Sequence, residues 1–327
     1  MAPLMRDLTK FVVASSLALL LTGCAAFERL GMRLLFDPTP WPEERVLENV
    51  AYLEGEQADP VKHRLNVFRP EGEGWPTLLF VHGGSWREGD KDLIVGGQDV
   101  YGNIGRFYAS KGIGVAVVSY RLQPAVDWRE QVEDVASAIG WVANEIESHG
   151  GDPGSIFLSG HSAGAQLVTY AALGDWPLPS DVRDRLCGVV AISGAGYDLA
   201  DERTYQLGAD LDFYEATFRT ADDWQERASA LAFLGGDAAN GAETKADVPP
   251  FLVFFAEKEH EALHRQAALL HEAVESSGSA SRLVEVPNVG HRRIIVEFSQ
   301  EDAVLAPAVV DFVEKNRGCS SSASAAP

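Results

Sequence analysis

From residue 50 onward, short apolar runs alternate with longer segments in which apolar residues recur every three or four positions. The first two runs are half polar, as in strands near the edge of a sheet. The later runs are continuous in valine, leucine, isoleucine and phenylalanine, which is typical of parallel strands with helices on both faces. The predicted strands are 50–53, 63–68, 77–81, 114–119, 156–159, 188–192, 251–255 and 283–286.

The segments between these runs have the apolar period of helices, most clearly WREQVEDVASAIGWVANEIES at 128–148. Strands that alternate with helices predict an α/β fold, here one mostly parallel sheet of eight strands covered on both faces. The predicted helices are 99–111, 128–148, 163–174, 258–277 and 299–317.

One connection, 197–249, is far longer than the others and has several aromatic residues. An insertion of this length beside a sheet is usually a lid or a pocket wall, so we expect a small cap over an apolar or aromatic substrate. The alternative is that the insertion is a surface loop without a role in binding. The aromatic residues are Phe213, Tyr214, Phe218 and Trp224.

Residues 1–23 have the pattern of an export signal. Arg6 and Lys10 precede an apolar run at 11–21, which is shorter than the roughly 20 residues of a membrane-spanning helix. The Leu-Thr-Gly-Cys that follows resembles the lipobox of bacterial lipoproteins, whose cysteine, here Cys24, is acylated and becomes the N-terminus. The resemblance implies an exported protein held by lipid at the cell envelope, in the outer membrane or at the periplasmic face if the source has two membranes. An ordinary signal peptide with a stray cysteine is the alternative.

Two glycine-rich motifs follow predicted strands. Gly160-His161-Ser162-Ala163-Gly164 lies between a strand and a helix, which is the context of a nucleophile elbow that exposes a reactive serine. The second motif, HGGSW at 82–86, follows another strand. Glycines there let backbone N–H groups approach a substrate oxyanion, so we expect donors from Gly83 or Gly84 together with Ala163. Ser85 and Trp86 are predicted to line the substrate pocket; for Trp86 the alternative is a core anchor.

These motifs resemble those of α/β-hydrolases of the HGGxW esterase group, which includes carboxylesterases, feruloyl-esterase-like and kynurenine-formamidase-like enzymes. HRLNVFRP, VSYRL, GGDPGSIFLSGHSAG and PPFLVFF also resemble segments of that family, and the resemblance covers about 48–315. It implies a catalytic domain at 48–317 with the insertion as its cap. A linker or lid segment at 24–47 precedes this domain, and a disordered tail at 318–327 follows it.

Chain order in this fold places the acid and then the histidine after the serine. His291 follows the last predicted strand in a Gly-His pair and is the predicted base. Glu259 has the position of the family's acid, where Asp is commoner, and Glu257 is the alternative. The resemblance thus implies a carboxylic ester hydrolase that forms an acyl-enzyme on Ser162. Amide or formamide hydrolysis by the same triad is the runner-up, and an inactive binding module is less expected.

A rival motif, HEALH at 260–264, matches the H-E-x-x-H pattern of zinc hydrolases, in which His260 and His264 would bind zinc and Glu261 would act as base. A serine hydrolase needs four motifs in order, which chance supplies far more rarely, so we expect a surface helix and no metal. The chain has no glycine-rich phosphate loop, dinucleotide fingerprint or CxxC pair, and no cofactor is expected.

The net charge of the chain limits the partners it can bind. The chain has 48 acidic residues against 27 lysines and arginines, a net charge of −21, which repels nucleic acid. The expected partners are therefore a small ester and, through the anchor, a membrane.

Parallel α/β topology places Cys187 and Cys319 on the side away from the active site, so they are predicted to form a disulfide after export; two free thiols are the alternative.

Overall fold

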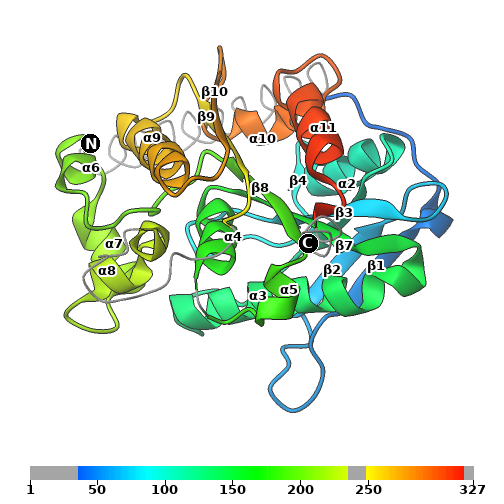
Figure 1. Ribbon diagram of the computed structural model, residues 1–327, viewed down its shortest axis with the longest axis horizontal. Helices are drawn as coiled ribbons and strands as arrows, with labels where there is room; N and C mark the ends of the chain where they lie inside the picture. Colours follow the sequence, from blue (N-terminus) through cyan, green and yellow to red (C-terminus); the bar gives the residue numbers. More distant parts are fainter. Residues whose placement is uncertain (1–35, 175, 235–247, 320–327) are drawn as a thin grey trace, which may run out of the picture.

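The computed structural model describes residues 36–174, 176–234 and 248–319, and its central feature is a sheet of eight strands (Figure 1). The strand order is β1-β2-β6-β3-β7-β8-β9-β10; β1 and β2 are antiparallel to their neighbours and the rest are parallel. This confirms the predicted mostly parallel sheet. The strands are β1 (Val46–Ala51), β2 (Arg64–Phe68), β3 (Trp75–Val81), β6 (Gly114–Val118), β7 (Gly151–His161), β8 (Leu186–Ile192), β9 (Phe251–Ala256) and β10 (Ser281–Val286).

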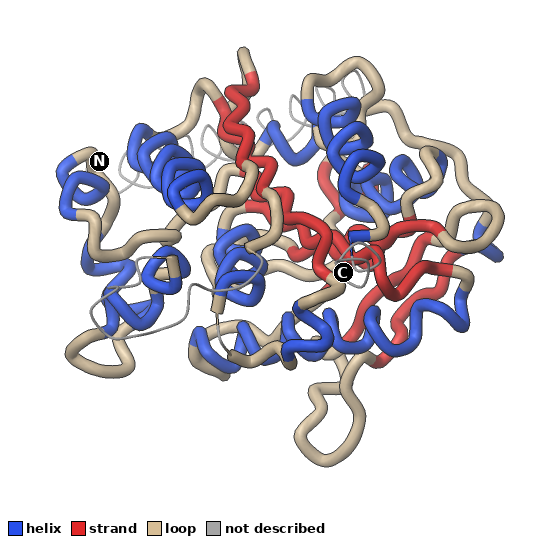
Figure 2. Tube along the Cα trace, viewed as in Figure 1, coloured by secondary structure: helices blue, strands red, loops and turns tan. Residues whose placement is uncertain are grey.

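Helices cover both faces of the sheet, and Figure 2 shows the strands passing between two groups of helices. Residues of β6 alternate between two hydrophobic cores: Ala116 and Val118 belong to one, Val115 and Val117 to the other. This period of two explains why the strand is a continuous apolar run. One core includes α3 (Trp128–Glu145), α4 (Ala163–Leu173) and α9 (Glu261–Ser276); the other includes α2 (Val100–Ser110), α10 (Arg293–Glu297) and α11 (Leu305–Asn316).

The final helix begins later than predicted. The sequence predicted one helix at 299–317, whereas α11 begins at Leu305 and a separate short helix, α10, precedes it. The smaller elements are η1 (Glu43–Arg45), β4 (Ile94–Val95), β5 (Gln98–Asp99), η2 (Ile146–His149) and α5 (Ser180–Arg183).

The described part of the insertion forms short helices at one end of the molecule (Figure 1). Asp201 and Asp210 cap two of them by accepting hydrogen bonds from backbone N–H groups. The insertion is bound firmly to the main domain, because the buried Trp128 indole donates to the Phe218 carbonyl at 3.0 Å and Gln123 donates to the Thr217 carbonyl at 3.0 Å. Its elements are α6 (Glu202–Gln206), α7 (Leu211–Phe218), α8 (Trp224–Ala228) and η3 (Ala230–Phe233).

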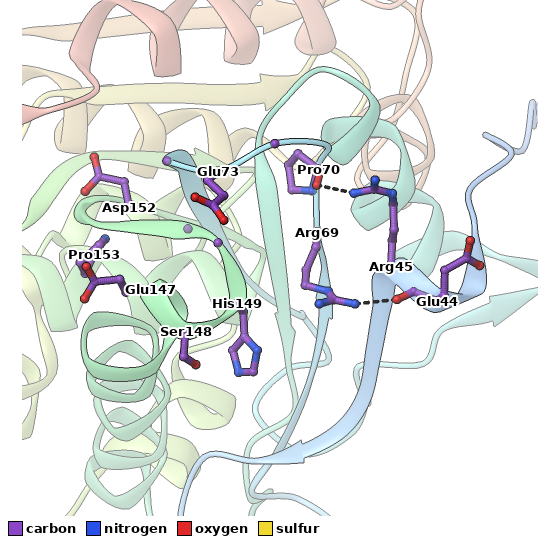
Figure 3. Close-up of a pocket in the computed structure, with 14 residues that line it drawn as sticks. Glu44, Arg45, Arg69, Pro70, Glu73, Glu147, Ser148, His149, Asp152 and Pro153 are labelled. Atoms are coloured by element: carbon purple, nitrogen blue, oxygen red, sulfur yellow. Dashed lines mark hydrogen bonds between the residues drawn. The ribbon is translucent and has the colours of Figure 1, made fainter.

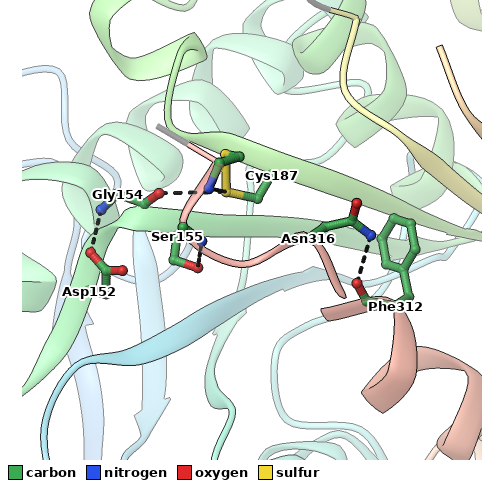
Figure 4. The surroundings of a disulfide bond; sticks show 8 residues. Asp152, Gly154, Ser155, Cys187, Phe312 and Asn316 are labelled. Atoms are coloured by element: carbon green, nitrogen blue, oxygen red, sulfur yellow. Dashed lines mark hydrogen bonds between the residues drawn. A yellow bond between two sulfur atoms is a disulfide. The ribbon is translucent and has the colours of Figure 1, made fainter. Parts of the chain in front are cut away.

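A disulfide joins Cys187, at the start of β8, to Cys319, just beyond α11 (Figure 4). The structure thus links the two cysteines that the sequence paired, across 132 residues of chain. The Gly318 N–H donates to the Ser155 hydroxyl at 3.2 Å beside this link. Both contacts lie at the amino ends of the strands, opposite the end that carries the nucleophile elbow.

The predicted export signal, Cys24 and the tail from residue 320 lie outside the described residues. The prediction of a disordered tail from residue 318 is wrong for Gly318 and Cys319, which the Ser155 hydrogen bond and the disulfide hold against the sheet. Among the residues that are described, no helix is both long enough and apolar enough to cross a membrane.

Candidate active site

Ser162 occupies a sharp turn between β7 and α4, at the carboxyl end of the sheet. Its φ of 54° and ψ of −120° are strained for a residue with a side chain, as expected of a nucleophile elbow. The turn requires both flanking glycines. A Cβ at Gly160 would lie 2.4 Å from the Gly164 backbone, and one at Gly164 would lie 2.2 Å from the Val81 carbonyl oxygen.

His291 lies between Ser162 and Glu259. Its Nε2 is 3.0 Å from Ser162 Oγ, and its Nδ1 is 2.9 Å from Glu259 Oε2. The Glu259 carboxylate is fully buried, and its Oε1 accepts the Ala256 N–H at 2.9 Å. Because a carboxylate only accepts hydrogen bonds, Nδ1 has the proton and the Nε2 lone pair faces the serine. This is the arrangement in which a histidine withdraws a proton from a serine.

Glu257, the alternative acid, has a different contact. Its Oε2 accepts the Asn288 N–H at 2.5 Å and so holds the loop that leads to His291. Asn288 has a left-handed φ of 64° in that loop. The structure therefore brings Glu259, and not Glu257, to the histidine.

His161 has a contact that the sequence did not reveal. Its Nε2 donates to the His291 carbonyl at 2.8 Å, and the two ring centroids are 4.9 Å apart. Burial, aided by the nearby His291, lowers the pKa of His161 to about 3, so this ring is neutral. Because a carbonyl oxygen only accepts, the single ring proton lies on Nε2. The sequence showed His161 only as a variable position inside the serine motif, where no local pattern indicates a contact 130 residues away.

The loop after β3 lies directly against the serine. A Cβ at Gly83 would be 3.1 Å from Ser162 Cβ, so a side chain there would force its neighbours to shift, whereas glycine fits without movement. The predicted oxyanion donors lie beside the serine. Gly83 and Gly84 line the same cavity as Ser162, and Ala163 is in the first turn of α4, where N–H groups have no partner within the helix.

The rest of this loop is held by buried contacts. The His82 ring stacks on Tyr120 with centroids 4.4 Å apart, and its Nδ1 donates to the Gly83 carbonyl at 2.6 Å. Burial lowers the pKa of His82 to about 4. Trp86 is 2% exposed, donates to Gln166 at 3.2 Å and meets Phe218 edge to face at 4.8 Å. The structure therefore places Trp86 as an anchor for the insertion.

A cavity of about 730 Å³ opens beside the triad. Ser85, Ser162 and His291 line it, whereas Trp86 is not among its lining residues. The aromatic residues of the insertion do not line it either; Tyr214, Phe218 and Trp224 are buried in the core that includes Trp86. The expectation that these rings form a lid over the substrate is wrong for this cavity, because they pack inward.

A second cavity, of about 770 Å³, lies at the opposite end of the sheet, near the start of β7 (Figure 3). Arg45 and Arg69 line it, but their guanidinium groups donate to the backbone carbonyls of Pro70 and Glu44. The length of β7 separates this cavity from Ser162, so it takes no part in the active site.

The H-E-x-x-H segment does not have the geometry of a zinc helix. His260 is the N-cap of α9 with an extended backbone, and its Nδ1 accepts the Ala262 N–H at 3.3 Å. His264 Nε2 donates to the Ala256 carbonyl at 2.8 Å. Only one of the two histidines is therefore inside the helix, and each ring has a partner in the fold. In the described parts of the chain, no three His, Cys, Asp or Glu side chains are grouped as metal ligands would be.

The arrangement of elbow, triad and glycine loop is that of an α/β-hydrolase. A family model described as alpha/beta hydrolase fold matches residues 78–295, a range that includes Ser162, Glu259 and His291. The chain therefore belongs to the α/β-hydrolase fold family.

Curated relatives with similar sequences are esterases by name. Esterase LipC of Mycobacterium tuberculosis is 29% identical over 225 residues, which are 66% of this chain and 52% of that protein. A probable isoprenylcysteine alpha-carbonyl methylesterase of Oryza sativa subsp. japonica is 36% identical over 131 residues, which are 39% of this chain and 28% of that protein. The chain thus spans about half or less of the length of these relatives.

Solved structures with the same fold include esterase B from Lactobacillus Rhamnosis, with a TM-score of 0.66, 17% identity and coverage of 99% of this chain and 98% of that chain. The hyperthermophilic esterase from Pyrobaculum calidifontis has a TM-score of 0.63 and 21% identity, with 99% of each chain covered. At these identities the likeness concerns the fold alone.

Proposed function

We propose that the protein hydrolyses carboxylic esters through an acyl-enzyme on Ser162. The observation that supports this most strongly is the unbroken hydrogen-bond chain from the Ala256 N–H through Glu259 and His291 to Ser162 Oγ. Such a chain makes a serine nucleophilic. That several relatives are named esterases supports the same activity.

The reaction proceeds in two halves. His291 Nε2 takes the Ser162 proton as Oγ attacks the ester carbonyl, and the N–H group of Gly83 or Gly84, together with that of Ala163, stabilises the resulting oxyanion. The carbon–oxygen bond to the alcohol then breaks, and the imidazolium returns its proton to the departing alkoxide. In the second half His291 deprotonates a water that attacks the acyl-enzyme, and the protonated histidine restores the Ser162 hydroxyl as the acid leaves.

The other residues act by position. Glu259 holds His291 in the required tautomer and stabilises its charged form, and the buried His161 holds the His291 backbone from the other side. The glycines and His82 keep the oxyanion loop against the serine. None of these steps needs a cofactor.

We propose further that the protein is exported and held at the cell envelope by acylation of Cys24. The lipobox-like segment supports this. Cell fractionation of the wild type and a Cys24→Ser variant tests it: the wild type should remain with membranes after a high-salt wash, and the variant should be released. Equal distribution of the two proteins would contradict the anchor.

A substrate panel tests the activity. p-Nitrophenyl acetate and p-nitroacetanilide differ only in the ester or amide link, so the ratio of their hydrolysis rates identifies the bond that is cleaved. The wild type should hydrolyse the ester far faster, with no change on adding a chelator, and Ser162→Ala should be inactive. Equal or faster hydrolysis of the amide would overturn the assignment to esters.

A further inference from the structure

The cavity beside Ser162 has three apolar walls that come from distant parts of the chain. One is the β4–β5 hairpin, one is the start of α2 and one is α10, the short helix that follows His291. Its volume of about 730 Å³ is within the range of small-molecule sites. The apolar side chains are Leu93 and Val95, Val100 and Tyr101, and Ile295 and Val296.

The hairpin presents alternate residues to the cavity. Leu93 and Val95 line it and are half-buried, whereas Ile94 between them does not line it and is 60% exposed. This alternation follows from the strand period of two. Apolar side chains that face a cavity instead of a packed core lose contacts that an apolar ligand would supply.

The rim of the cavity has no net charge. Arg293 is paired with Glu297 at 3.0 Å, and Arg292 and Glu88 are the other two charged lining residues. Two positive and two negative groups give no preference for a charged ligand. An uncharged apolar group therefore fits both the walls and the rim.

We propose that this cavity binds an uncharged apolar arm of the ester and sets how long that arm is. The proposal rests on the ester hydrolysis proposed above and adds the substrate class, an ester with an extended aliphatic or aromatic group. Selectivity then depends on the hairpin and α10, and not on Tyr214 and Phe218 of the insertion, which are buried against Trp86. Each methylene that enters such a site raises kcat/KM about threefold to fourfold until the cavity is full.

Two substrate series show which side of the ester occupies the cavity. One varies the acyl group, from p-nitrophenyl acetate to p-nitrophenyl octanoate, and the other varies the alcohol, from methyl acetate to octyl acetate. In one series kcat/KM should rise at least tenfold with chain length before it levels off. If neither series depends on length, the proposal is wrong.

A pair of hairpin variants tests the location. Val95→Trp fills the cavity, and Ile94→Trp makes the same change one residue away on the exposed face. The quantity compared is kcat/KM for the longest ester divided by kcat/KM for the acetate. Val95→Trp should lower this ratio at least tenfold, and Ile94→Trp should leave it within twofold of wild type. Equal ratios in both variants would overturn the proposal.

Folding and catalysis are checked separately. If near-UV circular dichroism shows that Val95→Trp is misfolded, Leu93→Ala takes its place. It enlarges the cavity and should move the chain length at which kcat/KM levels off to a longer ester; an unchanged length would overturn the proposal. If the wild-type protein does not hydrolyse the short acetate, or if Ser162→Ala hydrolyses it equally well, the proposed function itself is contradicted. Hydrolysis without length dependence would contradict only the cavity proposal.

Discussion

Replacing Glu259 by Gln tests the triad with a change of one atom. The Ala256 N–H, 2.9 Å from Oε1, requires an oxygen acceptor, so the amide oxygen of the new side chain will take that place. The NH2 group then faces His291 Nδ1, 2.9 Å from the present Oε2, and donates to it. Nδ1 must become the acceptor, the proton moves to Nε2, and Nε2 can no longer take the proton from Ser162.

In serine proteases, a catalytic histidine held in the wrong tautomer costs about 10⁴-fold in kcat, or about 5 kcal/mol in the barrier. We expect a loss of 10³- to 10⁴-fold in kcat for Glu259→Gln, with KM nearly unchanged. The fold should survive, because the glutamine side chain has the same shape as glutamate and is uncharged in the buried site.

Glu257→Gln is the matched control. It lies two residues away and accepts only the Asn288 N–H, so its kcat should stay within about fivefold of wild type. Initial rates on p-nitrophenyl acetate, with circular dichroism as the check on folding, give both values. A Glu259→Gln enzyme with more than a tenth of wild-type kcat, or a larger loss in Glu257→Gln, would refute the assignment of the acid.

Three further predictions concern the stability of the fold that positions the triad. Gly164→Ala should lower the free energy of unfolding by about 1–3 kcal/mol and kcat by at least 100-fold, since its Cβ would lie 2.2 Å from a carbonyl oxygen. Gly140→Ala, where a Cβ meets nothing within 4 Å, should instead stabilise by about 0.5–1 kcal/mol; urea titrations that rank the two variants the other way would contradict this. Peptide mapping without reductant should recover Cys187 and Cys319 as one linked peptide, and Cys319→Ser should cost about 2–5 kcal/mol; two separate thiol peptides would contradict the disulfide. Because burial lowers the pKa of His82 to about 4 and of His161 to about 3, the unfolded chain binds more protons as the pH falls below about 6.5. Stability should therefore decline by up to about 1.4 kcal/mol per pH unit for each histidine between pH 6.5 and 4, and urea midpoints that do not change with pH would contradict this.

Patterns close together in the sequence gave the most reliable predictions. The continuous apolar runs predicted the eight-stranded sheet, because parallel strands must bury both faces. Ser162 and the glycine loop each follow a strand directly, so a local motif was enough to place them at the same edge of the sheet. His291 and Glu259 could be placed because the chain order of this fold limits where a base and an acid can lie.

Contacts between distant segments could not be predicted in this way. The bond from His161 to the His291 carbonyl depends on how two loops meet in space, and no local pattern encodes it. The aromatic residues of the insertion suggested a lid, but the sequence did not reveal that three of them, Phe213, Tyr214 and Phe218, contact Trp86. The β4–β5 hairpin was missed because each strand has only two residues, too few to show a period.

The most direct test of the account is covalent labelling with a fluorophosphonate, which reacts only with an activated serine. The purified protein and its Ser162→Ala variant would be labelled with and without a chelator, and the adduct would be located by mass spectrometry. The account predicts one adduct on Ser162 that the chelator does not affect and that the variant lacks. No adduct on Ser162 in the folded wild-type protein, or an adduct lost on adding the chelator, would contradict it.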